Sequence, residues 1–330
     1  MSEDQLRVRL AEVERPKAHL RQVPRGGLAD RVWRSPEVQR ALPLSIALRL
    51  ARMRAGLAWR LSRRYRGAML MHATALAGPG ASREEVRRLA REHLAEQCLR
   101  GCFTLHPDTH IPVRGIEHLE RARAAGRGVI VATFHMGLWR NLKFALAAHG
   151  YRLYVSGLAG PPRPGPQGRS WIANEAWAEE VGCRWVTLGG SYAVFRALLE
   201  RGEVCKIEWD IPGRRPVPVE VLGRTLRISG GVARLALETG AFVVPGFAWR
   251  EPDGPVAVLF PAINPREVEG ESELNARIAS AFESALAPRL AQAHYPPWGG
   301  LCLAEFERVT GISSRRPSPG VPPPPRPGAG

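Results

Sequence analysis

One apolar stretch constrains the fold of this 330-residue chain more than any other. Residues 129–134 read Val-Ile-Val-Ala-Thr-Phe, an uncharged run that follows Gly128 and stops at His135. Short runs rich in β-branched residues are typical of strands buried on both faces of a sheet. A histidine after such a strand, with Gly137 close behind, lies where open α/β sheets place their sites. The stretch predicts a strand that delivers an imidazole to a site, although a structural histidine fits these residues equally well.

The rest of the chain alternates between strand-like and helix-like segments, which favours an α/β fold with a layered mixed β-sheet flanked by helices. We expect strands near 129–133, 152–156, 185–188, 204–209, 218–222, 242–249 and 255–260. We expect helices near 83–102, 116–125, from after His135 to a stop at Gly150, 170–181, 191–201, 231–238 and 272–287. Ser82 and Glu85 have the spacing of a capping box at the start of the first of these helices. The Gly- and Pro-rich segment 157–168 predicts a mobile loop or lid.

Charge divides the chain unevenly. Residues 1–70 hold 16 Arg and Lys against 6 Asp and Glu, a formal charge of +10 out of +16 for the whole chain. Such a bias favours an anionic partner. We expect a basic helical N-terminal region over 1–75, an α/β domain over 76–312 and a disordered Pro-rich tail over 313–330.

Segment 44–66 of the basic region has the pattern of an amphipathic helix. Its apolar residues at helical spacing are Ile46, Leu50, Met53, Leu57 and Leu61, and arginines flank them. Two interpretations stay open. The helix lies on an anionic membrane with its arginines at head-group level, or it packs its apolar side on the domain and leaves a solvated basic face.

Several other classes of protein are disfavoured. No uncharged apolar stretch of about 18 residues and no hydrophobic leader occurs, so we expect neither a spanning helix nor export. Five cysteines without zinc-type spacing indicate reduced thiols. No glycine-rich dinucleotide loop or Walker lysine loop is present. His106 and His110 beside a proline are typical of surface residues, so we expect no metal. No recognition motif accompanies the arginines, so we expect no nucleic-acid partner.

The segment Gly128–Asn141 resembles the histidine block of the bacterial lysophospholipid acyltransferase superfamily. It is most similar to the branch of lipid A late acyltransferases (lauroyl and myristoyl transferases) and phosphatidylinositol mannoside acyltransferases, whose block reads His-x-Gly-x-Trp followed by Glu or Asp. Further segments resemble that branch in the same order, namely 113–119, Arg169, 198–210, 231–245 and 295–298.

The resemblance implies a glycerolipid acyltransferase-like fold and the transfer of a fatty acyl group to a hydroxyl of a lipid or glycolipid. The donor would be an acyl-carrier-protein (ACP) or CoA thioester as co-substrate, with no cofactor, at the cytoplasmic face of the inner or plasma membrane. His135 would be the general base, and the N–H groups of Met136 and Gly137 would bind the oxyanion. The substrate-binding residues would be Gly137, Trp139, Arg140, Asn141 and Arg169, with Arg169 holding a phosphate of acceptor or donor.

Arg140 departs from the family pattern, because an acid normally stands there and stabilises the histidine when it is charged. Glu208 and Asp210 are the candidates to replace it. We expect one of them to hydrogen-bond His135, while Arg140 turns outward or pairs with the other. An ordinary salt bridge is the alternative for these acids. The alternative for the whole chain is a catalytically impaired or repurposed relative that binds lipid or acylates a non-phospholipid acceptor.

Overall fold

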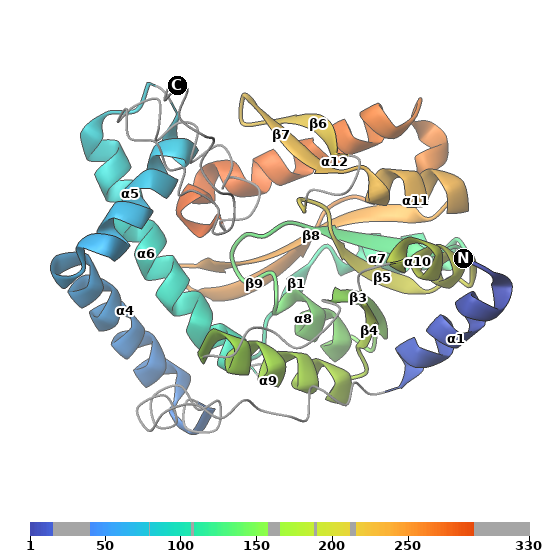
Figure 1. Cartoon of the computed structure of the whole chain (residues 1–330), viewed down its shortest axis with the longest axis horizontal. Helices are drawn as coiled ribbons and strands as arrows, with labels where there is room; N and C mark the ends of the chain where they lie inside the picture. The colour runs from blue at the N-terminus through green and yellow to red at the C-terminus, as the bar shows by residue number, and fades with distance from the viewer. Residues whose placement is uncertain are drawn as a thin grey trace, which may run out of the picture.

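The computed structural model describes residues 1–15, 40–78, 80–106, 109–157, 166–187, 190–211 and 216–293, with backbone alone for residues 64 and 166–171. A seven-stranded sheet in the order β1-β9-β8-β2-β5-β3-β4 forms its centre (Figure 1). These strands are β1 (Val113–Arg114), β2 (Val129–Thr133), β3 (Leu153–Gly157), β4 (Arg184–Thr187), β5 (Val204–Glu208), β8 (Phe242–Glu251) and β9 (Gly254–Leu259). The five strands from β8 to β4 are parallel, whereas β9 pairs with β8 antiparallel. The predicted mixed sheet flanked by helices is therefore confirmed.

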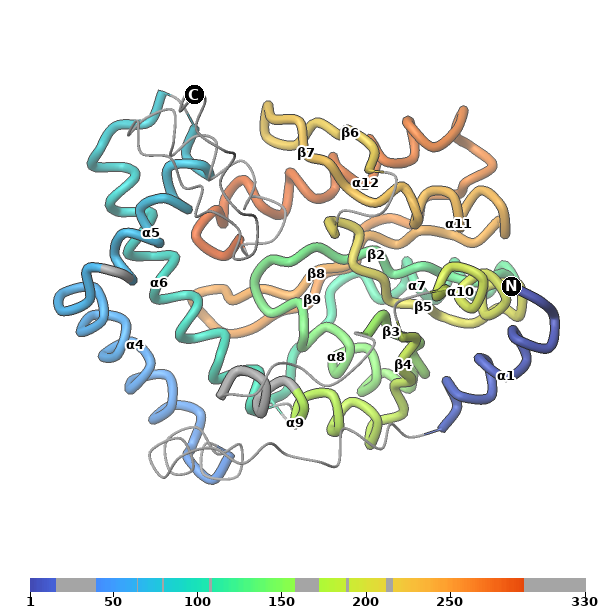
Figure 2. The backbone as a smooth tube through the Cα atoms, viewed as in Figure 1, coloured from blue at the N-terminus to red at the C-terminus, as the bar shows by residue number. Residues whose placement is uncertain are grey.

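Helices cover both faces of this sheet. The helices of the described residues are α1 (Glu3–Glu14), α4 (Leu44–Leu61), α5 (Arg63–Ala77), α6 (Arg83–Leu105), α7 (Ile116–Ala124), α8 (Leu142–Ala148), α9 (Pro166–Glu180), α10 (Ser191–Glu200), α11 (Gly231–Thr239) and α12 (Glu271–Leu286). Ile130 and Ala132 of β2 belong to the apolar cluster that contains α10, α11 and α12. Val129 and Val131 belong to the cluster that contains α7, α8 and α9. Figure 2 shows α11 and α12 above the sheet and α8 and α9 below it. β2 is therefore buried on both faces, as its apolar run predicts.

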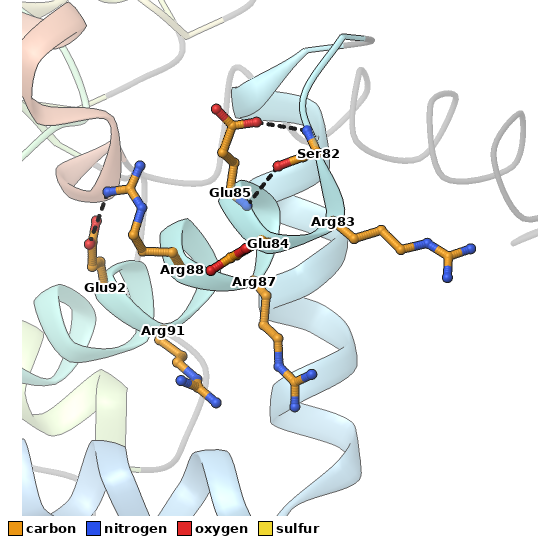
Figure 3. A pocket seen from close by; sticks show the side chains of 8 residues that line it. All are labelled: Ser82, Arg83, Glu84, Glu85, Arg87, Arg88, Arg91 and Glu92. Carbon is orange, nitrogen blue, oxygen red and sulfur yellow. Dashed lines mark hydrogen bonds and ion pairs between the residues drawn. The ribbon is translucent and has the colours of Figure 1, made fainter.

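Most expected elements are present within a few residues of their predicted bounds. The two-residue strand β1 and the hairpin strand β7 (Arg224–Ser229), which pairs with β6 (Pro216–Val221), were not expected. The Ser82–Glu85 capping box is present at the start of α6, with both of its hydrogen bonds (Figure 3). The segment expected to be a mobile loop is outside the described residues over 158–165, as is the expected tail over 313–330.

The described part of residues 1–75 is helical, and its helices lie on two sides of the molecule (Figure 1). α1 lies at the β4 edge of the sheet, where Glu14 accepts a hydrogen bond from Tyr154 at 2.8 Å and pairs with Arg152. α4 and α5 instead pack on α6. The single helix expected over 44–66 is two helices, because the chain breaks at Ser62 and its hydroxyl caps α5 by accepting from the Tyr65 N–H.

α4 packs through small residues and exposes its large apolar ones. Ala47, Ala51, Ala55 and Trp59 recur every four residues and are buried. Ile46, Leu50, Met53, Leu57 and Leu61 are between 39% and 80% exposed. The interpretation that this stripe packs on the domain is therefore wrong, because the alanine stripe allows a closer approach to α6. Exposed arginines at positions 49, 52, 54 and 60 flank the apolar face.

Two expectations about the environment of the chain can be compared with the described residues. Among them, no helix has the length and apolar character needed to cross a bilayer. Cys98, Cys102, Cys183 and Cys205 are free thiols. Burial raises the pKa of Cys102 and Cys183 to about 11, so both remain protonated at neutral pH.

Candidate active site

The candidate site lies at the carboxyl edge of the parallel strands β2, β5 and β3. Thr133, the last residue of β2, pairs in register with Glu208, the last residue of β5. The pairing continues past the strands, since the Trp209 N–H donates to the Thr133 carbonyl at 2.8 Å. His135 and Asp210 each follow two residues after these strand ends. Adjacent parallel strands therefore bring two side chains 75 positions apart in the sequence to one place.

Asp210 is hydrogen-bonded to His135 through both of its carboxylate oxygens. The Nδ1 atom of the imidazole lies 2.7 Å from Oδ1, and the backbone N–H of His135 donates to Oδ2 at 2.9 Å. The Asp210 side chain is fully buried, and that of His135 is 13% exposed. A carboxylate on Nδ1 fixes the tautomer that carries the proton there, which leaves Nε2 as the acceptor. The hydrogen bond expected from one of the two acids thus comes from Asp210.

This pair sets the charge state of the ring. Burial disfavours the imidazolium, but the charge and hydrogen bond of Asp210 outweigh it and raise the pKa of His135 above the ordinary 6.5. Glu208 contributes in the same direction, and Lys206 opposes it. A histidine held in this way accepts a proton more readily than a free imidazole does.

Trp209 and Asn275 hold the Asp210 loop in position. The indole Nε1–H of Trp209 donates to the Asn275 Oδ1 atom at 2.9 Å, and both side chains are buried. Asn275 lies on α12, far along the chain from the histidine block. The sequence does not predict this contact, because nothing in the spacing of the residues links Asn275 to the end of β5.

Glu208 belongs to a neighbouring ion pair rather than to the histidine. Its carboxylate lies 2.6 Å from the Nζ atom of buried Lys206 and accepts a hydrogen bond from the Ser156 hydroxyl at the end of β3. Burial alone would raise the pKa of Glu208, but the Lys206 ammonium and the other contacts lower it to about 2. The salt-bridge alternative therefore describes Glu208, and the histidine partner is Asp210.

Arg140 lies beside the catalytic candidates rather than in the position of a histidine partner. Its guanidinium carbon is 5.4 Å from the centre of the Trp139 ring. Burial lowers the pKa of Arg140, and the charges of Glu175 and Glu208 raise it. Glu175 itself lies 3.5 Å from Lys143, and its burial raises its pKa to about 7 against the effect of that lysine. Arg140 therefore lies in the electrostatic field of the buried acids Glu175 and Glu208.

The turn after His135 differs from the expected helix. α8 begins only at Leu142, and residues 137–141 form a turn. Gly137 has a φ of +51°, and a Cβ atom there would lie 2.4 Å from the Ala248 carbonyl oxygen. This glycine therefore allows the close backbone approach that the sequence predicts.

The N–H groups of Met136 and Gly137 are already engaged. Met136 donates to the Phe134 carbonyl at 2.7 Å, and Gly137 donates to the carbonyl of Gln292 at 2.7 Å. The expectation that they form the oxyanion hole is therefore wrong for this arrangement. The Gly137 N–H is engaged because the last turn of the described chain brings the Gln292 carbonyl onto the histidine loop.

The remaining predicted substrate residues have different environments. Trp139 is mostly buried, and its ring centre lies 5.2 Å from that of His135. Asn141 is fully buried, and its Nδ2 atom donates to the Phe103 carbonyl at 2.9 Å, so the prediction that it binds substrate does not fit. Arg169 lies on α9 in the stretch described by backbone alone, so its side chain is outside the described part.

In the described part of the chain, no group of three or more His, Cys, Asp or Glu side chains could hold a metal. The ring nitrogens of His106 lie 2.7 Å from the Cys102 carbonyl and 3.0 Å from the Leu42 carbonyl, which indicates a structural role. The charged hollow in Figure 3 is lined by α6 residues from Ser82 to Glu92 and has no histidine.

The chain is similar to curated proteins over part of its length. The chain is 30% identical over 195 residues to a phosphatidylinositol mannoside acyltransferase of Mycobacterium tuberculosis (strain CDC 1551 / Oshkosh), covering 56% of this chain and 57% of that protein. It is 29% identical over 193 residues to the protein of the same name from Mycolicibacterium smegmatis, covering 56% and 59%. The chain thus spans less than two thirds of these curated relatives.

No protein-family model matches the chain. A solved 1-acyl-sn-glycerophosphate acyltransferase from Thermotoga maritima aligns with a TM-score of 0.39 and 15% identity, over 78% of this chain and 99% of that one. The matched relatives agree with the resemblance to phosphatidylinositol mannoside acyltransferases, over 56% of this chain.

Proposed function

We propose that this protein is an acyltransferase that moves a fatty acyl group from a thioester of ACP or CoA to a hydroxyl of a lipid or glycolipid. The observation that carries the proposal is the His135–Asp210 pair, with Nδ1 and Oδ1 2.7 Å apart at the carboxyl edge of the sheet. The names of the matched relatives support the same chemistry and a lipid or glycolipid acceptor.

The pair can perform each proton transfer that this reaction needs. Nε2 of His135 removes the proton of the acceptor hydroxyl as its oxygen attacks the thioester carbonyl carbon. Asp210 stabilises the imidazolium that forms. When the tetrahedral intermediate collapses, the carbon–sulfur bond breaks and the imidazolium returns its proton to the leaving thiolate. The ring ends in its starting state, and the products are an ester and a free thiol.

The replaced motif acid leaves a catalytically impaired lipid binder as the competing proposal. Purified full-length protein should be mixed with acyl-ACP or acyl-CoA and with a lysophospholipid or a mannosylated glycolipid, and thiol release should be followed. We expect release that depends on the acceptor and falls about 10²- to 10⁴-fold in His135→Ala. His149→Ala, which removes an exposed histidine, is the matched control. Retained lipid binding without thiol release from any donor would favour the impaired relative.

We further propose that α4 holds the enzyme on an anionic membrane, at the cytoplasmic face of the inner or plasma membrane. The exposed apolar stripe of α4 with arginines on either side supports this placement, since such helices lie at the head-group boundary. An apolar stripe in this setting gains from entering the acyl boundary, while the guanidinium groups reach lipid phosphates.

Flotation with vesicles that contain or lack anionic lipid tests this placement. Met53→Glu and Leu57→Glu alter α4 side chains that are 63% and 52% exposed, and Val8→Glu alters a 58% exposed residue of α1 as a matched control. Each α4 variant should weaken binding to anionic vesicles about fivefold, from lost insertion and added like charge. Equal weakening in Val8→Glu, or binding that ignores lipid charge, would contradict the role of α4.

A further inference from the structure

Beyond the end of β2, the turn that leads into α8 and the short 3-10 helix η3 (Ala287–Gln292) supply partners for the edge of β8. β2 pairs with β8 only as far as Pro245, whereas β8 continues to Glu251. The backbone N–H and C=O groups of a strand that runs past its neighbour need other partners. The turn provides one of them, because the Leu138 N–H donates to the Ala248 carbonyl at 2.7 Å.

The side chain of Gln292, the last residue of η3, provides the others. Its Oε1 atom accepts from the Arg250 N–H at 3.0 Å, and its Nε2 atom donates to the Arg250 carbonyl at 2.7 Å. A carboxamide carries a donor and an acceptor side by side, so it bonds both backbone groups of one residue as an adjacent strand would. Gln292 is buried, and these two bonds fix it against the end of β8.

The backbone of Gln292 holds the turn that carries the candidate base. The Gln292 carbonyl accepts from the Gly137 N–H at 2.7 Å, and the next residue, Ala293, forms an antiparallel bridge with Met136. These contacts lie one and two residues after His135. Fixing Gln292 against β8 therefore also fixes the backbone next to the imidazole.

η3 has further anchors that do not involve the Gln292 side chain. The guanidinium carbon of Arg289 lies 4.1 Å from the centre of the Trp249 ring, and the Ala291 carbonyl lies 2.9 Å from the Nδ1 atom of His93. A change of the Gln292 side chain should therefore loosen the end of η3 and leave the rest of this helix in place.

We infer that Gln292 is a positioning residue for acyl transfer: its carboxamide ties η3 to β8, and its carbonyl, through Gly137, sets where His135 presents Nε2. The inference rests on the proposed acyl transfer for the reaction, whereas the tie between η3 and β8 does not depend on it. Asp210 then sets the charge and tautomer of the imidazole, and Gln292 sets its place. A displacement of about 1 Å is enough to slow an enzyme by up to about 10².

Gln292→Met in the full-length protein tests this role, because methionine has a similar length and makes neither bond to Arg250. At a temperature where the variant is fully folded, kcat should fall about tenfold and KM should change less than about twofold. Exchange of the Gly137 amide proton for deuterium, followed by NMR, should become about tenfold faster. The His135 N–H, which Asp210 holds, should exchange as before, and the pKa of His135 should stay the same.

Two control variants separate positioning from stability. Gln5→Met makes the same exchange in the exposed first turn of α1. Val221→Ala removes buried apolar atoms from β6 and should lower the stability of the fold without touching the turn. Both should keep the kcat of the unaltered protein. The exchange rate of Gly137 is compared in each variant with that of buried Val131 in β2, which reports global unfolding.

An unchanged kcat in folded Gln292→Met would overturn the positioning role, and so would an equal fall of kcat in Val221→Ala. Should Gln292→Met fail to fold, Gln292→Glu takes its place. Glutamate keeps the acceptor for the Arg250 N–H and loses the donor to the Arg250 carbonyl, so kcat should again fall while KM stays within about twofold. An unchanged kcat in Gln292→Glu would overturn the role as well.

Failure of this inference and failure of acyl transfer give different results. Faster Gly137 exchange in Gln292→Met, from a protein that releases no thiol with any donor, would refute the acyltransferase and keep the tie between η3 and β8. Thiol release at the same rate in Gln292→Met and in the unaltered protein would refute the positioning role and keep the acyltransferase.

Discussion

Glu208 and Asp210 lie two residues apart at the end of one strand, yet they belong to different electrostatic regions. Asp210 accepts both of its hydrogen bonds from His135. Glu208 is held between the Lys206 ammonium and the Ser156 hydroxyl. The first region joins a buried acid to a group that can gain and lose a proton. The second joins a buried acid to a buried lysine in an ion pair, which favours structure over proton transfer.

The neighbours of the two acids explain why Asp210 rather than Glu208 replaces the missing motif residue. Lys206 is almost wholly buried, so an ionised partner is needed to offset its desolvation. Glu208 supplies that partner from the same strand. Asp210 lies beyond the strand, where the hydrogen bond between Trp209 and Thr133 carries the chain toward the histidine loop. The task of each acid follows from its neighbours rather than from its residue type.

The largest expected effect is the loss of catalysis in Asp210→Asn. The amide keeps the size of the side chain but removes the charge that stabilises the imidazolium, and it allows the wrong tautomer. We expect kcat/KM to fall about 10³- to 10⁴-fold, as when a serine protease loses its triad acid. In Glu208→Gln, kcat/KM per folded molecule should fall far less. The comparison between the regions fails if Glu208→Gln lowers kcat/KM as much as Asp210→Asn does.

The opposite order is expected for stability, measured as the free energy of unfolding in urea. Glu208→Gln leaves the Lys206 ammonium buried without its partner and should cost about 3–5 kcal/mol. Asp210→Asn keeps an acceptor for the imidazole and should cost about 1 kcal/mol. Glu200→Gln on the exposed end of α10 should stay within about 0.5 kcal/mol as a control. Equal losses of unfolding free energy in Glu208→Gln and Asp210→Asn would show that the two regions are not distinct.

A smaller effect is expected at Asn275, which acts on the His135–Asp210 pair through Trp209. Asn275→Leu removes the acceptor of the indole N–H and should destabilise the fold by about 1–3 kcal/mol. The loosened Asp210 loop should also lower kcat/KM about tenfold at a temperature where the variant is fully folded. Asn275→Asp, which retains an acceptor, should recover most of that rate. An unchanged kcat/KM in Asn275→Leu would reduce the contact to a purely structural one.

The sequence predicts the positions of β2 and β5 because both are short apolar runs that end at polar residues. The sequence narrows the acid that partners His135 to Glu208 or Asp210. The choice between them depends on the burial of Lys206, which no sequence pattern reveals. The oxyanion expectation fails because Gln292, more than 150 residues away in the chain, takes the Gly137 N–H. Contacts between distant segments decide these details, and spacing along the chain does not encode them.

The α4 helix shows a second limit. Its large apolar residues and its alanines form two stripes of helical period, and periodicity alone favours burial of the larger ones. The alanine stripe is the buried one in the structure, since small side chains let α4 approach α6 closely. Hydrophobic pattern therefore predicts that α4 is amphipathic, whereas packing decides which stripe faces outward.

The most direct test of the central claim is the pKa of His135 itself, measured by NMR titration of the imidazole carbon-bound proton. Because the Asp210 charge raises this pKa above 6.5, the intact protein should titrate His135 above that value, and acyl transfer should rise with pH through the same midpoint. Asp210→Asn leaves burial dominant and should move the His135 pKa downward, with Glu208→Gln moving it less. A pKa at or below 6.5 in the intact protein, or one that Asp210→Asn leaves unchanged, would contradict the claim that Asp210 has taken the place of the acid lost at Arg140.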